Sequence, residues 1–200
     1  MSLRQVILVT HRWLGLSAAT VLFIVGATGA ALVWWHAPLL GRLHTGLLLR
    51  GFGRWLVIGS TIASLLLAIG GLVLWWRRKI LTTALGEGWW RITFDLHHLV
   101  GLVGCLLMLL IAATGLGLVL VPEGPRRPDR GSGLAAAPVT GGTKDRRLRK
   151  RIHSLHTARP YGWPIQALYV LGSAAFAFQA VSGFVMWWKP KRIPVPGEEP

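Results

Sequence analysis

Cysteine and acidic residues are scarce in this chain of 200 residues, and each scarcity excludes a kind of site. The single cysteine, Cys105, excludes an intrachain disulfide and a cluster of thiolate metal ligands. No C-x-x-C-H motif is present, so any haem would be held without covalent attachment. Only 7 Asp and Glu occur, and only Asp95 lies near a predicted membrane span, which leaves a carboxylate-bridged di-iron site without ligands. A hydrolase is poorly supported too, because no Ser-His-acid arrangement has a plausible context.

Apolar residues are abundant instead, at 52% of the chain, and they gather in four windows that contain almost no charge. Each window is close to the roughly 20 residues that a membrane-spanning helix needs. Tryptophan pairs end several of them, as is typical of residues at a membrane interface. We therefore predict an all-α membrane protein, a four-transmembrane-helix bundle whose first helix is retained rather than removed as a signal peptide. The windows are about 13–35, 55–76, 97–121 and 164–188.

The net charge of +15 is large for a membrane protein of this size. The charges lie between the predicted spans, so anionic lipid headgroups explain them better than nucleic acid does. An anionic substrate that approaches these loops is a second explanation. Nine Lys and Arg flank one predicted membrane face and thirteen flank the other, so charge alone leaves the orientation open.

Four histidines stand at matched positions of an internal repeat of the form A-B-A′-B′. The A units begin HRWLGL and HHLVGL, and each reaches the glycine of an Ala-Thr-Gly sequence eighteen residues after its first histidine. The B units begin HTG and HTA, and each reaches a glycine twenty-seven residues on, in GLVLWWRRK or GFVMWWKPK. The histidines that begin the four units are His11, His44, His97 and His156.

The repeat predicts a duplicated two-helix unit inside one bundle. Pro38 and Gly41 are expected to break the chain before His44. The basic run at 145–151 is expected to begin a short amphipathic helix that carries His156. The predicted organisation is a single transmembrane bundle over 1–192, with repeat 1 at about 8–80, repeat 2 at about 94–192, a flexible basic loop at 122–148 and a tail at 193–200.

The repeat also predicts where the histidines lie. Units A and A′ should cross the membrane in the same direction, which places His11 and His97 near one face and His44 and His156 near the other. Two histidines on facing helices can bind a haem iron from both axial sides. We therefore expect two b-type haems, with His11 and His97 as one pair of axial ligands and His44 and His156 as the other.

The ordinary explanation of a lone histidine is an interfacial residue that is hydrogen-bonded to headgroups or backbone. His36, His98 and His153 have no partner in the repeat, and we expect them to be interfacial. His98 stays a reserve candidate because it adjoins His97.

Other residues near the predicted sites have two interpretations each. Asp95 could orient a histidine ring, but a helix N-cap is favoured. Thr28 and Thr114 match in the repeat and bond either to a buried group or to their own helix. Small residues could make room for a flat macrocycle or for close helix packing. They are Gly15, Gly26, Gly29, Gly101, Gly104, Gly115 and Gly117.

The repeated HRWLGL/HHLVGL, ATG, HTG/HTA and Trp-Trp-basic segments resemble the PepSY-associated transmembrane family over about residues 8–192. The resemblance implies a bacterial inner-membrane protein linked to iron uptake, with a cytoplasmic N-terminus and the side of His44 and His156 facing the periplasm. Some members are implicated as haem-containing reductases of ferric siderophores. Larger members carry a periplasmic PepSY domain, whereas this chain resembles a short form without it.

The expected function is transmembrane electron transfer. Electrons would come from a quinol or a cytoplasmic-side reductant and pass through both haems to a ferric siderophore or other ferric chelate. The alternative is a non-enzymatic membrane subunit, or a haem-binding partner protein in iron uptake. The expected partners are membrane lipids, the electron donor and an anionic ferric chelate, with no nucleic acid.

Overall fold

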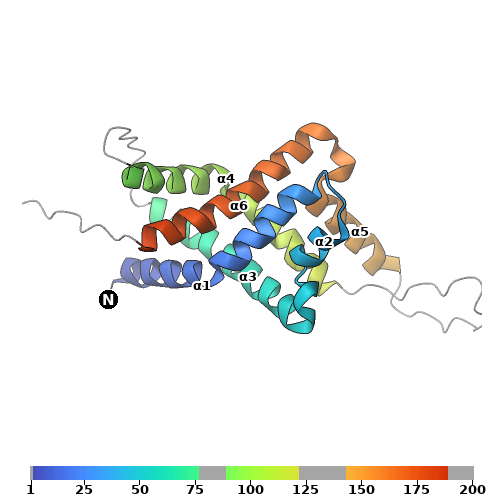
Figure 1. Cartoon of the computed structure of the whole chain (residues 1–200), viewed down its shortest axis with the longest axis horizontal. Helices are drawn as coiled ribbons and strands as arrows, with labels where there is room; N and C mark the ends of the chain where they lie inside the picture. Colours follow the sequence, from blue (N-terminus) through green and yellow to red (C-terminus); the bar gives the residue numbers. More distant parts are fainter. Residues whose placement is uncertain (1, 77–88, 122–142, 189–200) are drawn as a thin grey trace, which may run out of the picture.

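The computed structural model describes residues 2–76, 89–121 and 143–188, and throughout these ranges the regular structure is helical (Figure 1). Four helices are long and apolar enough to cross a membrane, which confirms the predicted all-α membrane bundle. Two shorter helices lie outside the spans. The helices are α1 (Leu3–Leu32), α2 (Pro38–His44), α3 (Arg50–Trp76), α4 (Trp89–Leu120), α5 (Thr143–Thr157) and α6 (Trp163–Trp188), with single 3₁₀ turns at Leu47–Leu49 and Arg159–Tyr161.

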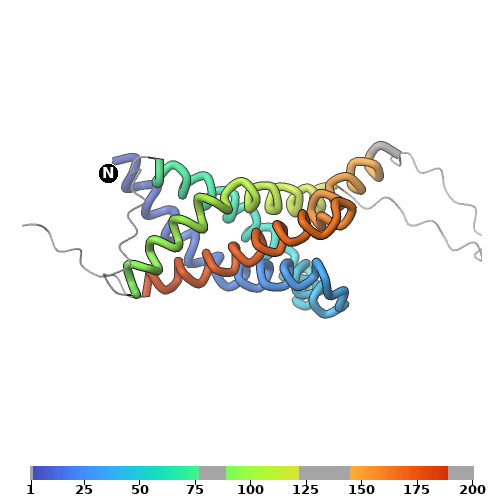
Figure 2. Tube along the Cα trace, turned by 90° about the horizontal axis from the view of Figure 1, so that it is seen from above, coloured from blue at the N-terminus to red at the C-terminus, as the bar shows by residue number. Residues whose placement is uncertain are grey.

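The four long helices run side by side, and α2 and α5 lie together at the end of the bundle opposite the N-terminus (Figures 1 and 2). Each of α1 and α4 contacts both α3 and α6. The short helices repeat this relation, since α2 packs on α1 and α5 packs on α4. The fold is thus a duplication, in which α1-α2-α3 corresponds to α4-α5-α6. Equivalent residues differ by 86 in α1 and α4 (His11 and His97) and by 112 in the remaining helices (His44 and His156).

The packing is that of a membrane bundle. Large apolar side chains in the middle of the helices point outward, with Leu106 82% exposed and Val103 75% exposed, while small residues such as Ala63 and Ser64 are buried. Helices in lipid associate through small residues because lipid tails already solvate the large apolar side chains. Gly26 is one such contact, since a Cβ atom there would lie 2.8 Å from a backbone oxygen of α6.

Two helices begin earlier than hydropathy predicts. α1 begins at Leu3 rather than near 13, because a capping box joins Ser2 and Gln5: the Gln5 amide donates to Ser2 Oγ and the Ser2 amide donates to Gln5 Oε1. α4 begins at Trp89 rather than near 97. Hydropathy reports the part of a helix that lies in lipid, and both helices continue beyond it.

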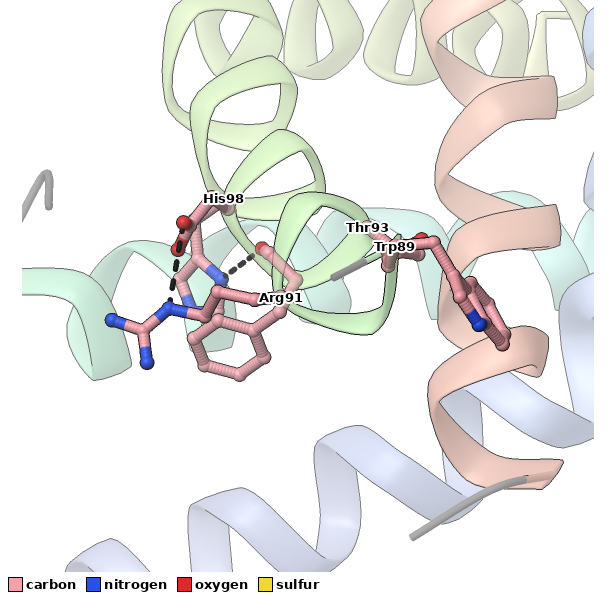
Figure 3. A network of polar contacts seen from close by, with 6 residues as sticks. Trp89, Arg91, Thr93 and His98 are labelled. Atoms are coloured by element: carbon pink, nitrogen blue, oxygen red, sulfur yellow. Dashed lines mark hydrogen bonds and ion pairs between the residues drawn. The ribbon is translucent and has the colours of Figure 1, made fainter. Parts of the chain in front are cut away.

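The early start of α4 makes the prediction for Asp95 wrong. Asp95 lies inside the helix and is not its N-cap, and its carboxylate is 3.5 Å from Nε of Arg91, one turn earlier. Figure 3 shows Arg91 and His98 on one side of this turn and Trp89 on the other. Asp95 therefore forms an ion pair within its own helix rather than orienting a histidine.

The predicted break at Pro38 and Gly41 is confirmed in part, because the helix is interrupted at 33–37, immediately before Pro38. Pro38 is the first residue of α2 and Gly41 lies within it. Proline suits the first turn of a helix because its fixed φ is already helical. The backbone N–H that it lacks would have no partner within the helix at that position. The chain turns back through 33–37, which brings α2 onto α1, and turns again after His44, where Gly46 has a φ of 73° and a Cβ atom would meet the backbone of Gly53.

The predicted amphipathic helix after the long loop is confirmed as α5, which carries both His153 and His156. Because α5 begins at Thr143, residues 143–148 are helical rather than part of a flexible loop. The rest of the predicted loop and the 193–200 tail lie outside the described residues.

Candidate functional site

His44 and His156 come together at the α2/α5 end of the bundle. Their ring centroids are 6.0 Å apart and the ring planes are inclined by 46°. His44 is the last residue of α2 and His156 lies in the last turn of α5. The two short helices thus fold back on α1 and α4 and bring the two B-unit histidines together.

The His44 ring is held by α1. Its Nδ1 is 3.0 Å from the carbonyl oxygen of Val25 and 3.3 Å from Oγ1 of Thr28. A carbonyl oxygen only accepts, so Nδ1 carries the hydrogen and the lone pair is on Nε2. The Thr28 hydroxyl donates to the Ile24 carbonyl at 2.6 Å, which leaves its oxygen to accept from the ring.

The His156 ring repeats these contacts on α4. Its Nδ1 is 3.2 Å from the carbonyl oxygen of Ile111 and 3.1 Å from Oγ1 of Thr114. The Thr114 hydroxyl donates to the Leu110 carbonyl at 2.7 Å. Each threonine therefore does both things that its sequence position allowed: it bonds to its own helix and contacts a buried ring. Both imidazoles keep Nε2 free to act as a metal ligand.

Two of the predicted small residues make room for these rings. A Cβ atom on Gly29 would lie 3.1 Å from Cε1 of His44, and one on Gly115 would lie 3.1 Å from Cε1 of His156. The other candidates face different groups, such as the α6 backbone for Gly26. Only this repeated Gly-His contact places a predicted glycine against a B-unit histidine.

Burial keeps both histidines neutral. Desolvation lowers the pKa of His156 to about 4, and the neighbouring His44 adds to this effect, while its hydrogen bond to Ile111 opposes it. Desolvation also lowers the pKa of His44, and the bond to Val25 opposes it. A neutral imidazole is the form that binds a metal, so near pH 7 neither ring needs to lose a proton before it can bind one.

The donor set fits a metal that brings most of its own ligands. In the described parts of the chain, no group of three or more His, Cys, Asp or Glu is placed to hold a metal ion. A bare zinc ion would want three or four such ligands, whereas a haem iron needs only two axial ones. His44 and His156, whose ring centroids are 6.0 Å apart, are the residues that would hold such an iron through Nε2. The backbone bonds through Nδ1 are typical of metal-binding histidines.

His97 lies at the other end of the bundle, and α6 holds its ring. Its Nδ1 is 2.7 Å from Oγ of Ser182, whose hydroxyl donates to the Phe178 carbonyl at 2.8 Å. The serine oxygen therefore accepts from Nδ1–H, and Nε2 again keeps the lone pair. A Cβ atom on Gly183 would lie 3.6 Å from Cε1 of this ring.

His11 occupies the equivalent position on α1 but is held differently. A Cβ atom on Gly71 would lie 3.4 Å from Cε1 of His11, which repeats the contact between Gly183 and His97. However, Nδ1 of His11 is buried and has no hydrogen-bond partner within the described residues. His11 and His97 are close enough for an electrostatic interaction. The second predicted pair thus shares one end of the bundle, with unequal support for its two rings.

The three histidines without a partner in the repeat have different surroundings. His36 and His153 are exposed. His98 donates from Nδ1 to the Phe94 carbonyl at 2.8 Å, within its own helix (Figure 3). Its ring centroid is 6.1 Å from that of His97. It therefore bonds to its own helix, at the end of the bundle that holds His11 and His97.

Sequence reasoning missed two polar residues that touch His97. Ser182 bonds to its ring, and Gln179 donates from Nε2 to its backbone carbonyl at 2.9 Å. A signal was present, because both residues depart from the repeat: the first repeat has Gly70 and Leu67 at these positions.

α5 has a second face, opposite the one that carries His156. Arg149 belongs to the bundle side, where Nη1 donates to the carbonyls of Leu118 and Val121 at 2.5 and 2.6 Å and so satisfies the C-terminal end of α4. The outer side is cationic and borders a hollow of about 310 Å³. The hollow is lined by Arg147, Lys150, Arg151, Ser154 and Pro160.

Comparison with known proteins identifies the family of this chain. No curated protein and no solved structure matches the sequence. The family model described as the PepSY-associated TM region matches residues 35–189, which is more than half of the chain. The matched segment contains His44, His97 and His156 and begins after His11. The chain is therefore a multi-pass membrane protein that belongs to the PepSY-associated TM family.

Proposed function

We propose that this protein is a transmembrane electron carrier that binds two b-type haems, one between His44 and His156 and one between His11 and His97. The observation that carries the proposal is the 6.0 Å separation of the His44 and His156 rings, each with Nδ1 bonded to a helix carbonyl. The chain holds, orients and buries the ligands. Haem iron supplies the one-electron chemistry, because it is stable in both the ferric and ferrous states.

We further propose a bacterial inner-membrane location with a cytoplasmic N-terminus, as the family resemblance implies. The α2/α5 end then faces the periplasm, and the His11/His97 end faces the cytoplasmic side. A quinol or a cytoplasmic-side reductant would supply the electrons, and a quinol would release two protons with its two electrons. A ferric chelate at the α2/α5 end would take one electron per iron and become ferrous.

The cationic hollow on α5 supports an anionic acceptor. Arg147, Lys150 and Arg151 line it, and they lie on the same short helix as His156. A negatively charged ferric siderophore would be concentrated there by this local positive charge. Arg149 is a poor choice for testing this idea, because it holds the end of α4.

Purification from haem-replete cells tests the proposal. We expect two haems per chain and sharp absorbance bands on reduction, and addition of a ferric siderophore should reoxidise the reduced protein. A haem-containing protein that the siderophore leaves reduced would instead be the alternative, a haem-binding subunit that serves a partner. A colourless protein would contradict the proposal.

A triple substitution tests the acceptor site. Changing Arg147, Lys150 and Arg151 to Gln should raise the apparent KM for an anionic ferric chelate and leave that for an uncharged chelate unchanged. Arg12→Gln, an exposed arginine at the opposite end, is the matched control. An unchanged KM in the triple variant would contradict the assignment of the hollow.

A further inference from the structure

The two A-unit histidines meet different groups across equivalent helix pairs. Nδ1 of His97 faces Ser182, which is only 2% exposed. The equivalent residue of the first repeat is Gly70, and a Cβ atom there would lie 3.6 Å from Nδ1 of His11. The approach of the ring to the helix is similar in both repeats, since a Cβ atom on Gly71 would lie 3.4 Å from Cε1 of His11 and one on Gly183 would lie 3.6 Å from Cε1 of His97. What the first repeat lacks is the hydroxyl group.

The backbone of these two histidines also has a polar neighbour in the second repeat and an apolar one in the first. Gln179 donates to the carbonyl of His97, and Gly101 makes room for it, since a Cβ atom there would lie 2.5 Å from Nε2 of Gln179. In the first repeat the corresponding contact joins Gly15 and Leu67, with 3.6 Å to the leucine Cδ2. The same helix contact thus carries a polar side chain in the second repeat and an apolar one in the first.

We propose that Ser182 is a positioning residue that fixes the His97 ring with the hydrogen on Nδ1, and that Gly70 leaves His11 without this constraint. The serine hydroxyl donates to the Phe178 carbonyl, so its oxygen can only accept from the ring. The two histidines at this end are consequently unequal ligands: His97 is preoriented through Ser182, whereas Nδ1 of His11 is buried without a partner in the described residues.

The expected effect on a metal rests on the proposed function. A hydrogen bond from Nδ1 makes an imidazole a stronger donor and holds its orientation. Removing it should weaken haem retention by about 10- to 100-fold and shift the midpoint potential of this haem upward, because the ferric state loses more stabilisation than the ferrous state. The position of the hydrogen on the ring is independent of haem.

A reciprocal pair of substitutions tests the proposal. Ser182→Ala makes the second repeat resemble the first, and Gly70→Ser gives the first repeat the hydroxyl of the second. The full chain, labelled with ¹⁵N in histidine and placed in lipid vesicles without haem, is measured by solid-state NMR. In the unsubstituted protein, His97 should show a protonated Nδ1 and a bare Nε2. Ser182→Ala should move it to a mixture of both forms, while Gly70→Ser should shift the His11 ring toward the Nδ1-protonated form.

The controls separate positioning from a structural role. Ser64→Ala removes another buried serine, one whose hydroxyl bonds only within its own helix at 2.7 Å to Thr61, and it should leave both rings unchanged. Ser182→Thr keeps a hydroxyl and should restore the His97 spectrum. An unchanged His97 spectrum in Ser182→Ala would overturn the proposal. If that variant fails to fold, an unchanged His11 spectrum in Gly70→Ser would do so.

The haem-loaded protein gives an independent measurement. Redox titration should show one of two midpoint potentials rising in Ser182→Ala and one falling in Gly70→Ser. Two midpoint potentials that neither substitution changes would overturn the inference. A protein without haem would refute the proposed function, and the NMR result would still decide the inference about Ser182.

Discussion

The two ends of the bundle use the same duplicated framework in different ways. At the α2/α5 end the contacts are repeated atom for atom: each ring meets a threonine, a helix carbonyl and a glycine. At the opposite end only the glycine contacts of Gly71 and Gly183 are repeated, and Ser182 supports one ring alone. Duplication therefore repeats the surroundings of the rings at one end, whereas the exchanges of Gly70 for Ser182 and of Leu67 for Gln179 make the surroundings differ at the other.

The largest expected effect is loss of one haem when a ring at the symmetric end is removed. His156→Ala should lower the haem content from two per chain to one, because a single histidine leaves an axial position empty. The remaining spectrum should be that of the His11/His97 haem. His153→Ala, on the exposed side of the same helix, should retain two. An unchanged haem content in His156→Ala would contradict the assignment.

A large side chain on the glycine beside this ring should act nearly as strongly. In Gly115→Leu the Cβ atom would already lie 3.1 Å from Cε1 of His156, and the rest of the side chain would occupy the space of the ring. We expect the same haem to be lost while the protein still inserts and folds. Gly59→Leu is the matched control, since nothing lies within 4 Å of a Cβ atom there. Equal haem contents for the two variants would show that the ring does not need this space.

A third variant tests asymmetry in the packing rather than at the rings. Gly26 packs against the α6 backbone, whereas its equivalent in α4 is Ala112. Gly26→Ala should destabilise the bundle by about 1–3 kcal/mol, because the backbone of α6 must move away from the new methyl group. Gly59→Ala meets open space and should be neutral or slightly stabilising. Thermal unfolding in detergent measures both, and equal stabilities would contradict the close α1–α6 contact.

The smallest effect concerns pH in protein prepared without haem. Free histidine has a pKa of 6.5, and burial lowers that of His156 to about 4. The unfolded chain therefore binds the proton first, so the stability gained by docking α5 should fall as pH drops from about 6.5 to about 4 and then level off. An NMR titration of the ring should find His156 still neutral at about pH 5.5. Protonation near pH 6.5 would show that the ring is not buried against α4.

The repeat predicted much of this arrangement from residue spacing alone. The order of the four spans, the placement of His44 with His156 and the amphipathic helix at His156 all follow from hydropathy and from the duplicated units. Hydropathy could not predict that α1 begins at Leu3, because a capping box rather than an apolar run sets that end. Pro38 and Gly41 were predicted to break the chain, but Pro38 starts α2 and Gly41 lies within it, because proline also fits the first turn of a helix.

The support around each ring was harder to predict. His11 and His97 stand on spanning helices, whereas His44 and His156 lie on the short helices α2 and α5 and yet bring their ring centroids within 6.0 Å. Their meeting depends on how α2 folds back on α1 through 33–37 and how α5 packs on α4. Residue spacing carries no information on the direction of such turns. In the sequence, Ser182 is visible only as a departure from the repeat. Its contact with His97 is seen only in the structure.

The haem-to-protein ratio of the purified wild-type chain decides whether the matched histidines form two haem sites. Protein from haem-replete cells should contain two non-covalently bound haems per chain and show the sharp reduced bands of bis-histidine ligation. A ratio of one that His156→Ala leaves unchanged would contradict the site at the α2/α5 end. A colourless protein that takes up no added haem would contradict both haem sites.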